Sequence, residues 1–205
     1  MLDKDIEAKE AKIFFKQWLK APMQLGTLAP ISKRLAKAGA RAINPTKDDL
    51  IVEIGAGTGR WTRALIEQGV RPDQLITVEL DLVMHGFLQK TLPAYTHVLG
   101  DACLLEDLIP PLWKGRVTKI VSAIPFMYLE PSLRLKIVNA CFECLKEGGD
   151  LFHLTYNPRS PLSFLPQKDM EQTRVCSLWF NVPPGFVWRY QKRASSFTNV
   201  LYKVA

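Results

Sequence analysis

The sequence predicts an α/β protein with a mostly parallel sheet, and the arrangement of its apolar runs leads to this fold class. Short runs rich in apolar and β-branched residues recur at 50–54, 75–80, 95–99, 117–122 and 149–156. Segments of helical character follow the first four runs, at 58–69, 81–90, 103–109 and 132–146. Strands separated by helices of this length form parallel sheets covered on both faces.

The pattern changes after Pro161, where aromatic and β-branched residues predict three further strands at 173–181, 186–192 and 196–203. The tripeptide Pro183-Pro184-Gly185 provides a turn between the first two of these strands. We therefore expect a mostly parallel seven-stranded sheet with helices on both faces, closed by antiparallel C-terminal strands.

The N-terminal region is a candidate membrane contact. Residues 4–20 have a helical pattern that places the four lysines Lys9, Lys12, Lys16 and Lys20 opposite an apolar side containing Phe14, Phe15, Trp18 and Leu19. Such a helix fits an interface between water and lipid, and it fits packing of its aromatic side onto the protein's own core equally well. A second helix is expected from Ser32, a good N-cap residue, to about Ala42. We divide the chain into an N-terminal arm, residues 1–47, and a catalytic domain, residues 48–205.

Composition agrees with a globular protein and points to an anionic partner. The chain has 205 residues, of which 47% are hydrophobic and 23% charged, with a net charge of +7. Residues 1–47 hold ten Lys and Arg against four Asp and Glu, so most of the positive charge lies in the arm. That excess suits an anionic lipid surface or a nucleic acid, although a solubilising helix face is the commoner explanation. The four cysteines and the charged N-terminus predict a cytoplasmic protein. Cys141 and Cys144 have the spacing of a metal-binding pair, but no second Cys pair or His lies at ligand spacing, so we expect no bound metal.

A glycine-rich turn follows the first predicted strand and indicates a nucleotide-type site. Residues 51–59 read IVEIGAGTG, so Gly55, Gly57 and Gly59 alternate after a strand and before a helix. Glycines at these positions keep the turn tight and let the backbone approach a ligand. Glu53 precedes the first glycine by two residues, and Arg60 stands where a dinucleotide fingerprint has its last glycine. This arrangement resembles motif I of the class I S-adenosylmethionine-dependent methyltransferases.

Two acidic residues complete the expected cofactor site. Glu79 ends the second predicted strand, 22 residues after Gly57, where a carboxylate can accept hydrogen bonds from ribose hydroxyls. Asp101 follows the third strand, and in the methyltransferase pattern this acid receives the adenine amino group. NAD is the rival cofactor, but it leaves Asp101 without a role. The expected cofactor is S-adenosylmethionine, with S-adenosylhomocysteine as product, held by Glu53, Gly55, Ala56, Gly57, Gly59, Glu79, Asp101, Ala102 and Ser122.

The segment after the fourth strand bears on the methyl acceptor. Adenine-N6 methyltransferases carry Asn or Asp, an apolar residue, Pro and an aromatic residue at this place, and this chain has Ala123, Ile124, Pro125 and Phe126. Because the alanine side chain cannot accept a hydrogen bond, the departure disfavours a nucleic-acid substrate.

The chain is more specifically similar to the bacterial phospholipid N-methyltransferases, which methylate phosphatidylethanolamine towards phosphatidylcholine. The likeness spans nearly the whole chain and rests on residues 14–19, 28–36, 51–59, 122–125, 154–161 and 179–190. It implies a Rossmann-like class I methyltransferase fold and a peripheral enzyme of the cytoplasmic membrane, whose first helix binds the bilayer.

Candidate residues for the acceptor follow from this resemblance and from amine chemistry. We expect Ser122, Ile124 and Tyr156 to act at the reacting nitrogen, with Tyr156 as a hydrogen-bond partner or cation–π platform. The substrate-binding candidates are Trp18, Pro125, Phe126, Tyr156, Arg159 and Arg189, the two arginines for the lipid phosphate. The alternative hypotheses are an RNA adenine N6-methyltransferase, in which the basic arm would bind phosphates, and a non-catalytic cofactor- or lipid-binding module.

Overall fold

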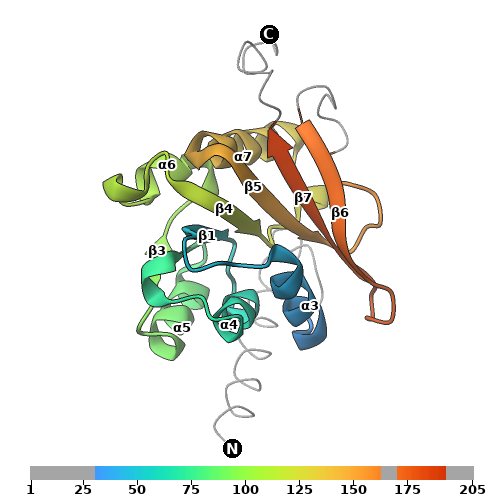
Figure 1. Ribbon diagram of the computed structural model, residues 1–205, viewed down its shortest axis with the longest axis horizontal. Helices are drawn as coiled ribbons and strands as arrows, with labels where there is room; N and C mark the ends of the chain where they lie inside the picture. The colour runs from blue at the N-terminus through green and yellow to red at the C-terminus, as the bar shows by residue number, and fades with distance from the viewer. Residues whose placement is uncertain (1–30, 163–169, 193–205) are drawn as a thin grey trace, which may run out of the picture.

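The computed structural model describes residues 31–162 and 170–192 (Figure 1). The expected helix at 4–20, with its lysines and Trp18, lies outside the described residues, and so does the expected strand at 196–203. Predictions about those segments therefore remain predictions.

Within the described residues, seven strands form one sheet in the order β3-β2-β1-β4-β5-β7-β6 (Figure 1). The first five pair in parallel, β7 runs antiparallel to β5, and β6 runs antiparallel to β7. This confirms the predicted fold class. The strands are β1 (Ile51–Ile54), β2 (Leu75–Glu79), β3 (Thr96–Leu99), β4 (Val117–Ser122), β5 (Leu145–Thr155), β6 (Met170–Leu178) and β7 (Gly185–Lys192).

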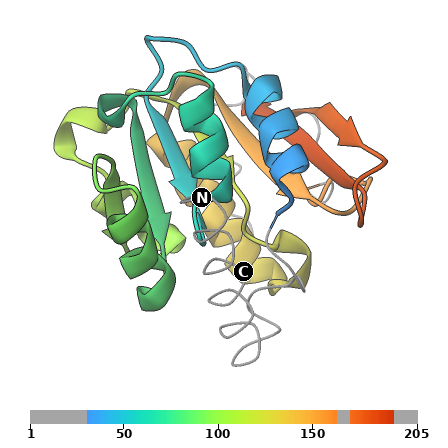
Figure 2. The same cartoon turned by 90° about the horizontal axis from the view of Figure 1, so that it is seen from below.

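Helices cover both faces of the sheet (Figure 2). One buried cluster joins α3 (Lys33–Ile43) and α4 (Arg60–Glu67) to the sheet, and the other joins α6 (Leu105–Leu108) and α7 (Pro131–Cys144) to it. The helix α5 (Leu82–Thr91) packs on β2 and β3. β1 and β2 are buried along their whole length because both of their faces are covered. Among the described helices, none combines the length and apolar character that crossing a bilayer requires.

Several predicted boundaries differ from the structure, and β6 begins and ends three residues before the strand expected at 173–181. The helix expected at 103–109 is divided into a 3₁₀ turn (Ala102–Leu104) and the short α6, because the Asp101 carboxylate caps the turn by accepting a hydrogen bond from the Cys103 amide at 2.9 Å. β5 begins at Leu145, four residues before the predicted start, and its pairing with β4 shifts register between Val117 and Lys119.

The helix α3 belongs to the same packed body as the sheet. Ser32 caps it as predicted, since its hydroxyl accepts a hydrogen bond from the Leu35 amide at 3.1 Å. Leu35 and Ala40 are fully buried against Trp61 and Val187. Although the sequence groups α3 with the N-terminal arm, its apolar side is therefore part of the core.

Candidate functional site

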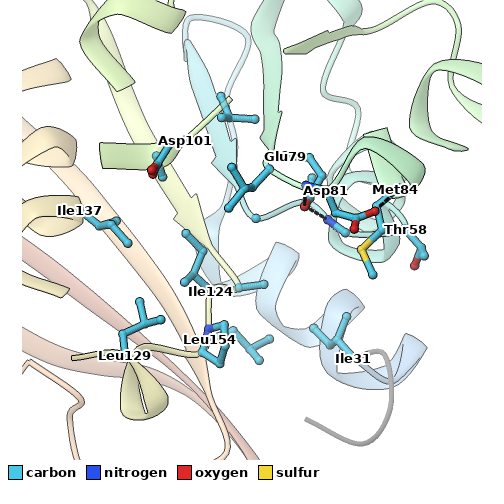
Figure 3. A pocket seen from close by; sticks show the side chains of 18 of the residues that line it. Ile31, Thr58, Glu79, Asp81, Met84, Asp101, Ile124, Leu129, Ile137 and Leu154 are labelled. Carbon is cyan, nitrogen blue, oxygen red and sulfur yellow. Dashed lines mark hydrogen bonds between the residues drawn. The ribbon is translucent and has the colours of Figure 1, made fainter. Parts of the chain in front are cut away.

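A cleft of about 490 Å³ opens at the edge of the sheet where the parallel strands end (Figure 3). It collects residues from the turns that follow β1, β2, β3 and β4, and from the end of β5. Parallel α/β sheets bind their ligands at this edge, because the strand ends and helix N-termini converge there.

The glycine turn forms one wall of the cleft in a conformation that other residues rarely adopt. Gly55, Gly57 and Gly59 have φ angles of 67°, 58° and 82°. A Cβ atom on Gly55 would lie 2.6 Å from Ile124 Cγ1, and one on Gly59 would lie 2.6 Å from Leu88 Cδ2. The backbone conformation thus favours glycine at all three positions, and the close approach of neighbouring side chains adds to this at Gly55 and Gly59.

The Glu79 carboxylate connects this turn to the end of β2. Its Oε2 accepts a hydrogen bond from the Gly57 amide at 2.7 Å, and its Oε1 accepts one from the Asp81 amide at 2.9 Å. Burial raises the pKa of Glu79, and the bonds from the Asp81 and Gly57 amides partly oppose that effect. The carboxylate is therefore fixed at the cleft wall, and each oxygen retains a further lone pair for a ligand.

The far end of the cleft has an acid and apolar walls. Asp101 is exposed at the cleft, and Ala102, Leu80, Ile124 and Ile137 contribute apolar surface. A flat, partly polar ring system can lie between such walls, with a hydrogen-bond acceptor at its edge.

A second cavity of about 420 Å³ shares a wall with the cleft, made of Ala123, Pro125, Leu154 and Tyr156. Its other boundaries include Phe126, His153, Asn157 and Pro158. The Phe126 ring is fully buried and stacks on the His153 ring, with centroids 4.2 Å apart and planes inclined by 3°. Burial, with a smaller contribution from Arg134, lowers the pKa of His153 to about 3, so its imidazole is neutral near pH 7.

Comparison with known proteins identifies the kind of site. The sequence profile of a family described as a methyltransferase domain matches residues 51–149. The ribosomal RNA small subunit methyltransferase A of Sulfurihydrogenibium sp. (strain YO3AOP1) is 33% identical over 181 residues, which cover 81% of this chain and 69% of that protein. The chain belongs to the class I S-adenosylmethionine-dependent methyltransferases.

Other relatives are matched over a smaller part of their length. The enzyme of the same name from Rhodopseudomonas palustris (strain BisB5) is 35% identical over 117 residues, covering 56% of this chain and 40% of that protein. The chain spans less than half the length of the first curated relatives that it matches.

Solved structures share the fold of this methyltransferase. A TehB-like S-adenosylmethionine-dependent methyltransferase from Corynebacterium glutamicum has a TM-score of 0.59 at 17% identity, covering 91% of this chain and all of that chain. TrmN from Thermus thermophilus has a TM-score of 0.62 at 16% identity, covering 82% of this chain and 52% of that chain. At these identities the likeness concerns the fold.

The residues of the cleft fit S-adenosylmethionine, the cofactor of this methyltransferase. The cleft volume of about 490 Å³ lies within the usual range for a small-molecule site. Glu79 offers carboxylate oxygens to a ribose diol, and Asp101 offers an acceptor to an exocyclic amino group. Arg60 also lines the cleft, and its guanidinium donates to the Ile31 carbonyl at 3.0 Å, which holds the chain before α3 at the cleft rim.

The structure brings together most of the residues that the sequence singled out. Nine of them line the cleft, namely Gly55, Ala56, Gly57, Glu79, Asp101, Ala102, Ile124, Pro125 and Tyr156. Gly59 lies at the start of α4, and Phe126 lines the second cavity. Arg159 is exposed and does not line that cavity, although Asn157 and Pro158 just before it do.

Three predicted residues lie elsewhere. Glu53 and Ser122 are fully buried and do not line the cleft. The Ser122 hydroxyl accepts a hydrogen bond from the Ile124 amide at 3.3 Å, and burial raises the pKa of Glu53 to about 8. The Arg189 guanidinium lies 3.7 Å from Glu171 and 4.0 Å from Asp150 on the sheet and lines neither of the two cavities, which does not favour its assignment to a lipid phosphate.

Sequence reasoning assigned no chemistry to Met84, Thr58 or His153, although all three line one of the cavities. The signal for His153 was its place near the end of a predicted strand, which is common to many core residues. Only its stacking on Phe126 marks it as part of the site.

Proposed function

We propose that the protein transfers methyl groups from S-adenosylmethionine to the amine of phosphatidylethanolamine, and to its mono- and dimethylated forms, at a membrane surface. The acceptor enters the second cavity, which meets the cofactor cleft at Ala123, Pro125, Leu154 and Tyr156. This proposal names a substrate class that fits the chemistry of that cavity.

The observation that carries the proposal is the buried stack of Phe126 on His153. An aromatic residue at this place in adenine-N6 methyltransferases stacks on the target base, which requires an accessible ring face. The Phe126 side chain has no exposed surface, and His153 occupies one of its faces. Ala123, on the shared wall, also lacks a side-chain acceptor for an adenine amino group. A compact aliphatic amine needs neither an accessible aromatic ring face nor a side-chain acceptor for an adenine amino group.

The chain's own groups at this junction orient an amine more readily than they deprotonate it. The cofactor supplies the activated methyl group on its sulfonium. Burial raises the pKa of Tyr156, so its hydroxyl stays protonated and acts as a hydrogen-bond partner for the nitrogen. The Ile124 carbonyl accepts a hydrogen bond from the Phe126 amide at 2.8 Å and has a second lone pair for an N–H of the acceptor. Ser122 acts indirectly, because its hydroxyl holds the Ile124 amide.

Arg159 is the candidate for the lipid phosphate. Its side chain is exposed, and it follows Asn157 and Pro158, which line the second cavity. Its amide donates to Asn157 Oδ1 at 2.8 Å, which fixes the turn. A guanidinium pairs with phosphate oxygens in a bidentate manner. The phosphate of an ethanolamine headgroup lies only a few bonds from its amine, so both groups reach this part of the site together.

Attachment to the cytoplasmic face of the membrane through residues 4–20 remains part of the proposal. The lysines of that segment would attract anionic lipid by about 1 kcal/mol per charge near the surface. Its aromatic residues would enter the headgroup layer, so that charge and apolar burial act together in a reversible attachment.

The direct test is incubation of the full chain with labelled S-adenosylmethionine and vesicles of phosphatidylethanolamine and phosphatidylglycerol, followed by separation of the lipids. We expect label in methylated phosphatidylethanolamine, and none with phosphatidylcholine in place of phosphatidylethanolamine. Unlabelled lipid, with an active cofactor site shown by binding of S-adenosylhomocysteine, would contradict the proposed substrate.

Methylation of adenine in ribosomal RNA is the second candidate, and the names of the curated relatives favour it. The same labelled cofactor should therefore be offered with small-subunit RNA in a parallel reaction. Incorporation into N6-methyladenine without incorporation into lipid would reverse the order of the two candidates.

A further inference from the structure

We propose that the tip of the β6–β7 hairpin, residues 179–184, inserts into the headgroup layer of a bilayer and sets the mouth of the site against it. In Figure 1 this connection projects beyond the sheet at the lower right. The inference rests on the proposed lipid substrate, and it concerns a surface separate from residues 4–20.

The hairpin tip exposes large apolar side chains to an unusual degree. Trp179, Phe180 and Val182 are 58%, 88% and 96% exposed. Side chains with so little contact to their own protein protrude, whereas the anchors of protein–protein interfaces typically fill pockets at the centre of a buried patch. A protruding aromatic and aliphatic tip is suited to the interfacial region of a membrane.

The tip is anchored firmly to the rim of the site. The Ser32 hydroxyl donates a hydrogen bond to Asn181 Oδ1, and the Asn181 amide group donates to the Pro183 carbonyl at 2.5 Å. Trp179 packs edge-on against the buried Phe186, with centroids 5.0 Å apart. Ser32 follows Ile31, which lines the cleft, so this hydrogen bond connects the tip to the segment at the cleft mouth.

Register places the tip at the correct edge of the sheet. Phe186 on β7 pairs with Thr155, the last residue of β5, and the tip therefore extends past the end of β5 towards the side where the cleft opens. Other exposed apolar residues gather at the same edge, with Leu80 and Leu82 after β2 and Met127 and Tyr128 after β4. Among the large apolar side chains exposed in the described segments, Leu112 alone precedes a parallel strand, at the opposite edge.

The charges beside the tip favour an anionic lipid surface over other occupants. Lys33 and Arg34 are exposed in the first turn of α3, next to Ser32, and Arg174 is exposed on β6. Residues 31–43 and 172–184 contain no Asp or Glu. Basic side chains and a protruding apolar tip are two signals that together give reversible binding to anionic membranes.

The test is co-sedimentation of the full chain with vesicles of phosphatidylethanolamine and phosphatidylglycerol, comparing wild type with the double variant Phe180→Ser/Val182→Ser. We expect the vesicle partition constant to fall about ten-fold or more. Phe180→Leu/Val182→Leu, which keeps the apolar character, should bind within about two-fold of wild type. The matched control is Leu112→Ser, at a residue 78% exposed at the opposite edge, and it should leave binding unchanged.

A partition constant for the serine double variant within two-fold of wild type would overturn the proposal, and so would an equal loss in Leu112→Ser. A change of oligomeric state by size exclusion in the serine variant alone, without loss of vesicle binding, would assign the tip to a second copy of the chain instead. The thermal unfolding midpoint confirms that each variant is folded. Vesicle binding needs no turnover, so this result stands apart from the substrate assay.

Methylation of a short-chain phosphatidylethanolamine dispersed as monomers separates the two proposals further. If the lipid substrate is right, wild type and the serine variant should methylate the dispersed lipid at equal rates and differ only on vesicles. If neither methylates it while the variant still loses vesicle binding, the substrate proposal fails and the membrane contact stands.

Discussion

The Phe126 ring lies flat on the His153 imidazole, with ring centroids 4.2 Å apart. This contact joins the turn after β4 to the end of β5, the two segments that enclose the second cavity. It also removes Phe126 from the surface, which supports our proposal of an aliphatic amine over a base as acceptor. Burial keeps the His153 imidazole neutral. The pH dependence of the free energy of unfolding should therefore reflect this burial.

The pH dependence of stability should report the buried His153. Its pKa is about 3 in the folded protein and near 6.5 in the unfolded chain. Between these values the unfolded chain binds more protons, so the free energy of unfolding rises with pH by up to about 1.4 kcal/mol per unit. His153→Phe, which retains an aromatic ring against Phe126, should flatten this rise in urea denaturation measured from pH 4 to 7.

Glu53 makes the free energy of unfolding fall with rising pH, opposite to His153, so its carboxyl group must be replaced for this measurement. Burial raises its pKa from 4.5 to about 8, so its contribution to stability is present below pH 4.5 and is lost as the pH rises to 8. The protein with His153 and the His153→Phe variant are therefore compared in a Glu53→Gln background. A curve that stays equally steep after His153→Phe would show that His153 is not the titrating group.

Gly55→Ala should be far more damaging than an alanine at a glycine with open surroundings. Its φ of 67° costs an alanine roughly 1–2 kcal/mol, and its Cβ would lie 2.6 Å from Ile124 Cγ1. Gly69, with a φ of 90° and no atom within 4 Å of an added Cβ, carries the strain without the clash. We expect a lower thermal midpoint for both variants, and loss of S-adenosylhomocysteine binding only for Gly55→Ala. Equal behaviour would mean that contact with Ile124 is unimportant.

Removal of the Glu79 carboxylate should weaken cofactor binding specifically. Glu79→Ala deletes the acceptor of the Gly57 amide and the acceptors expected for the ribose. Because such hydrogen bonds are charge-assisted, we expect the affinity for the cofactor to fall roughly 10- to 100-fold. Isothermal titration with S-adenosylhomocysteine measures the change. Asp73→Ala, at an exposed carboxylate before β2, serves as the control and should bind as wild type. Tight binding by Glu79→Ala would exclude the carboxylate from the cofactor site.

Tyr156→Phe should slow turnover without weakening cofactor binding. The hydroxyl stays protonated because burial raises its pKa, so it contributes one hydrogen bond, and its loss is expected to lower kcat about three- to ten-fold. Tyr128→Phe removes a hydroxyl from a side chain that is 61% exposed at the rim of the same cavity, and it should leave kcat unchanged. An identical effect of the two substitutions would argue against a role for Tyr156 at the reacting nitrogen.

Arg159→Ala should raise the apparent KM for lipid at least about five-fold and leave the KM for cofactor unchanged, because a guanidinium–phosphate pair acts on the lipid alone. Arg116, an exposed arginine before β4 at the opposite edge of the sheet, provides the matched control as Arg116→Ala. Initial rates on mixed vesicles give both constants. Equal changes in the two KM values would contradict the phosphate assignment.

The glycine turn, Glu79 and Asp101 could be predicted because each is defined by local chemistry. Positive φ angles call for glycine, and an acid at a strand end is visible as a single letter in a regular pattern. Helix boundaries were less accurate where capping decided them, as at Asp101, whose carboxylate ends the preceding loop by capping a 3₁₀ turn.

The sequence by itself determined the fold class and the glycine turn with its neighbouring acids that line the cleft, since alternating periodicity and backbone conformation are encoded within a few neighbouring residues. Tertiary structure alone decided which side chains share the second cavity. It placed His153 beneath Phe126 and moved Arg189 to the acids on β5 and β6, because strand pairing across the sheet sets those distances. It also showed that Phe180 and Val182 remain uncovered, which depends on how every other element packs.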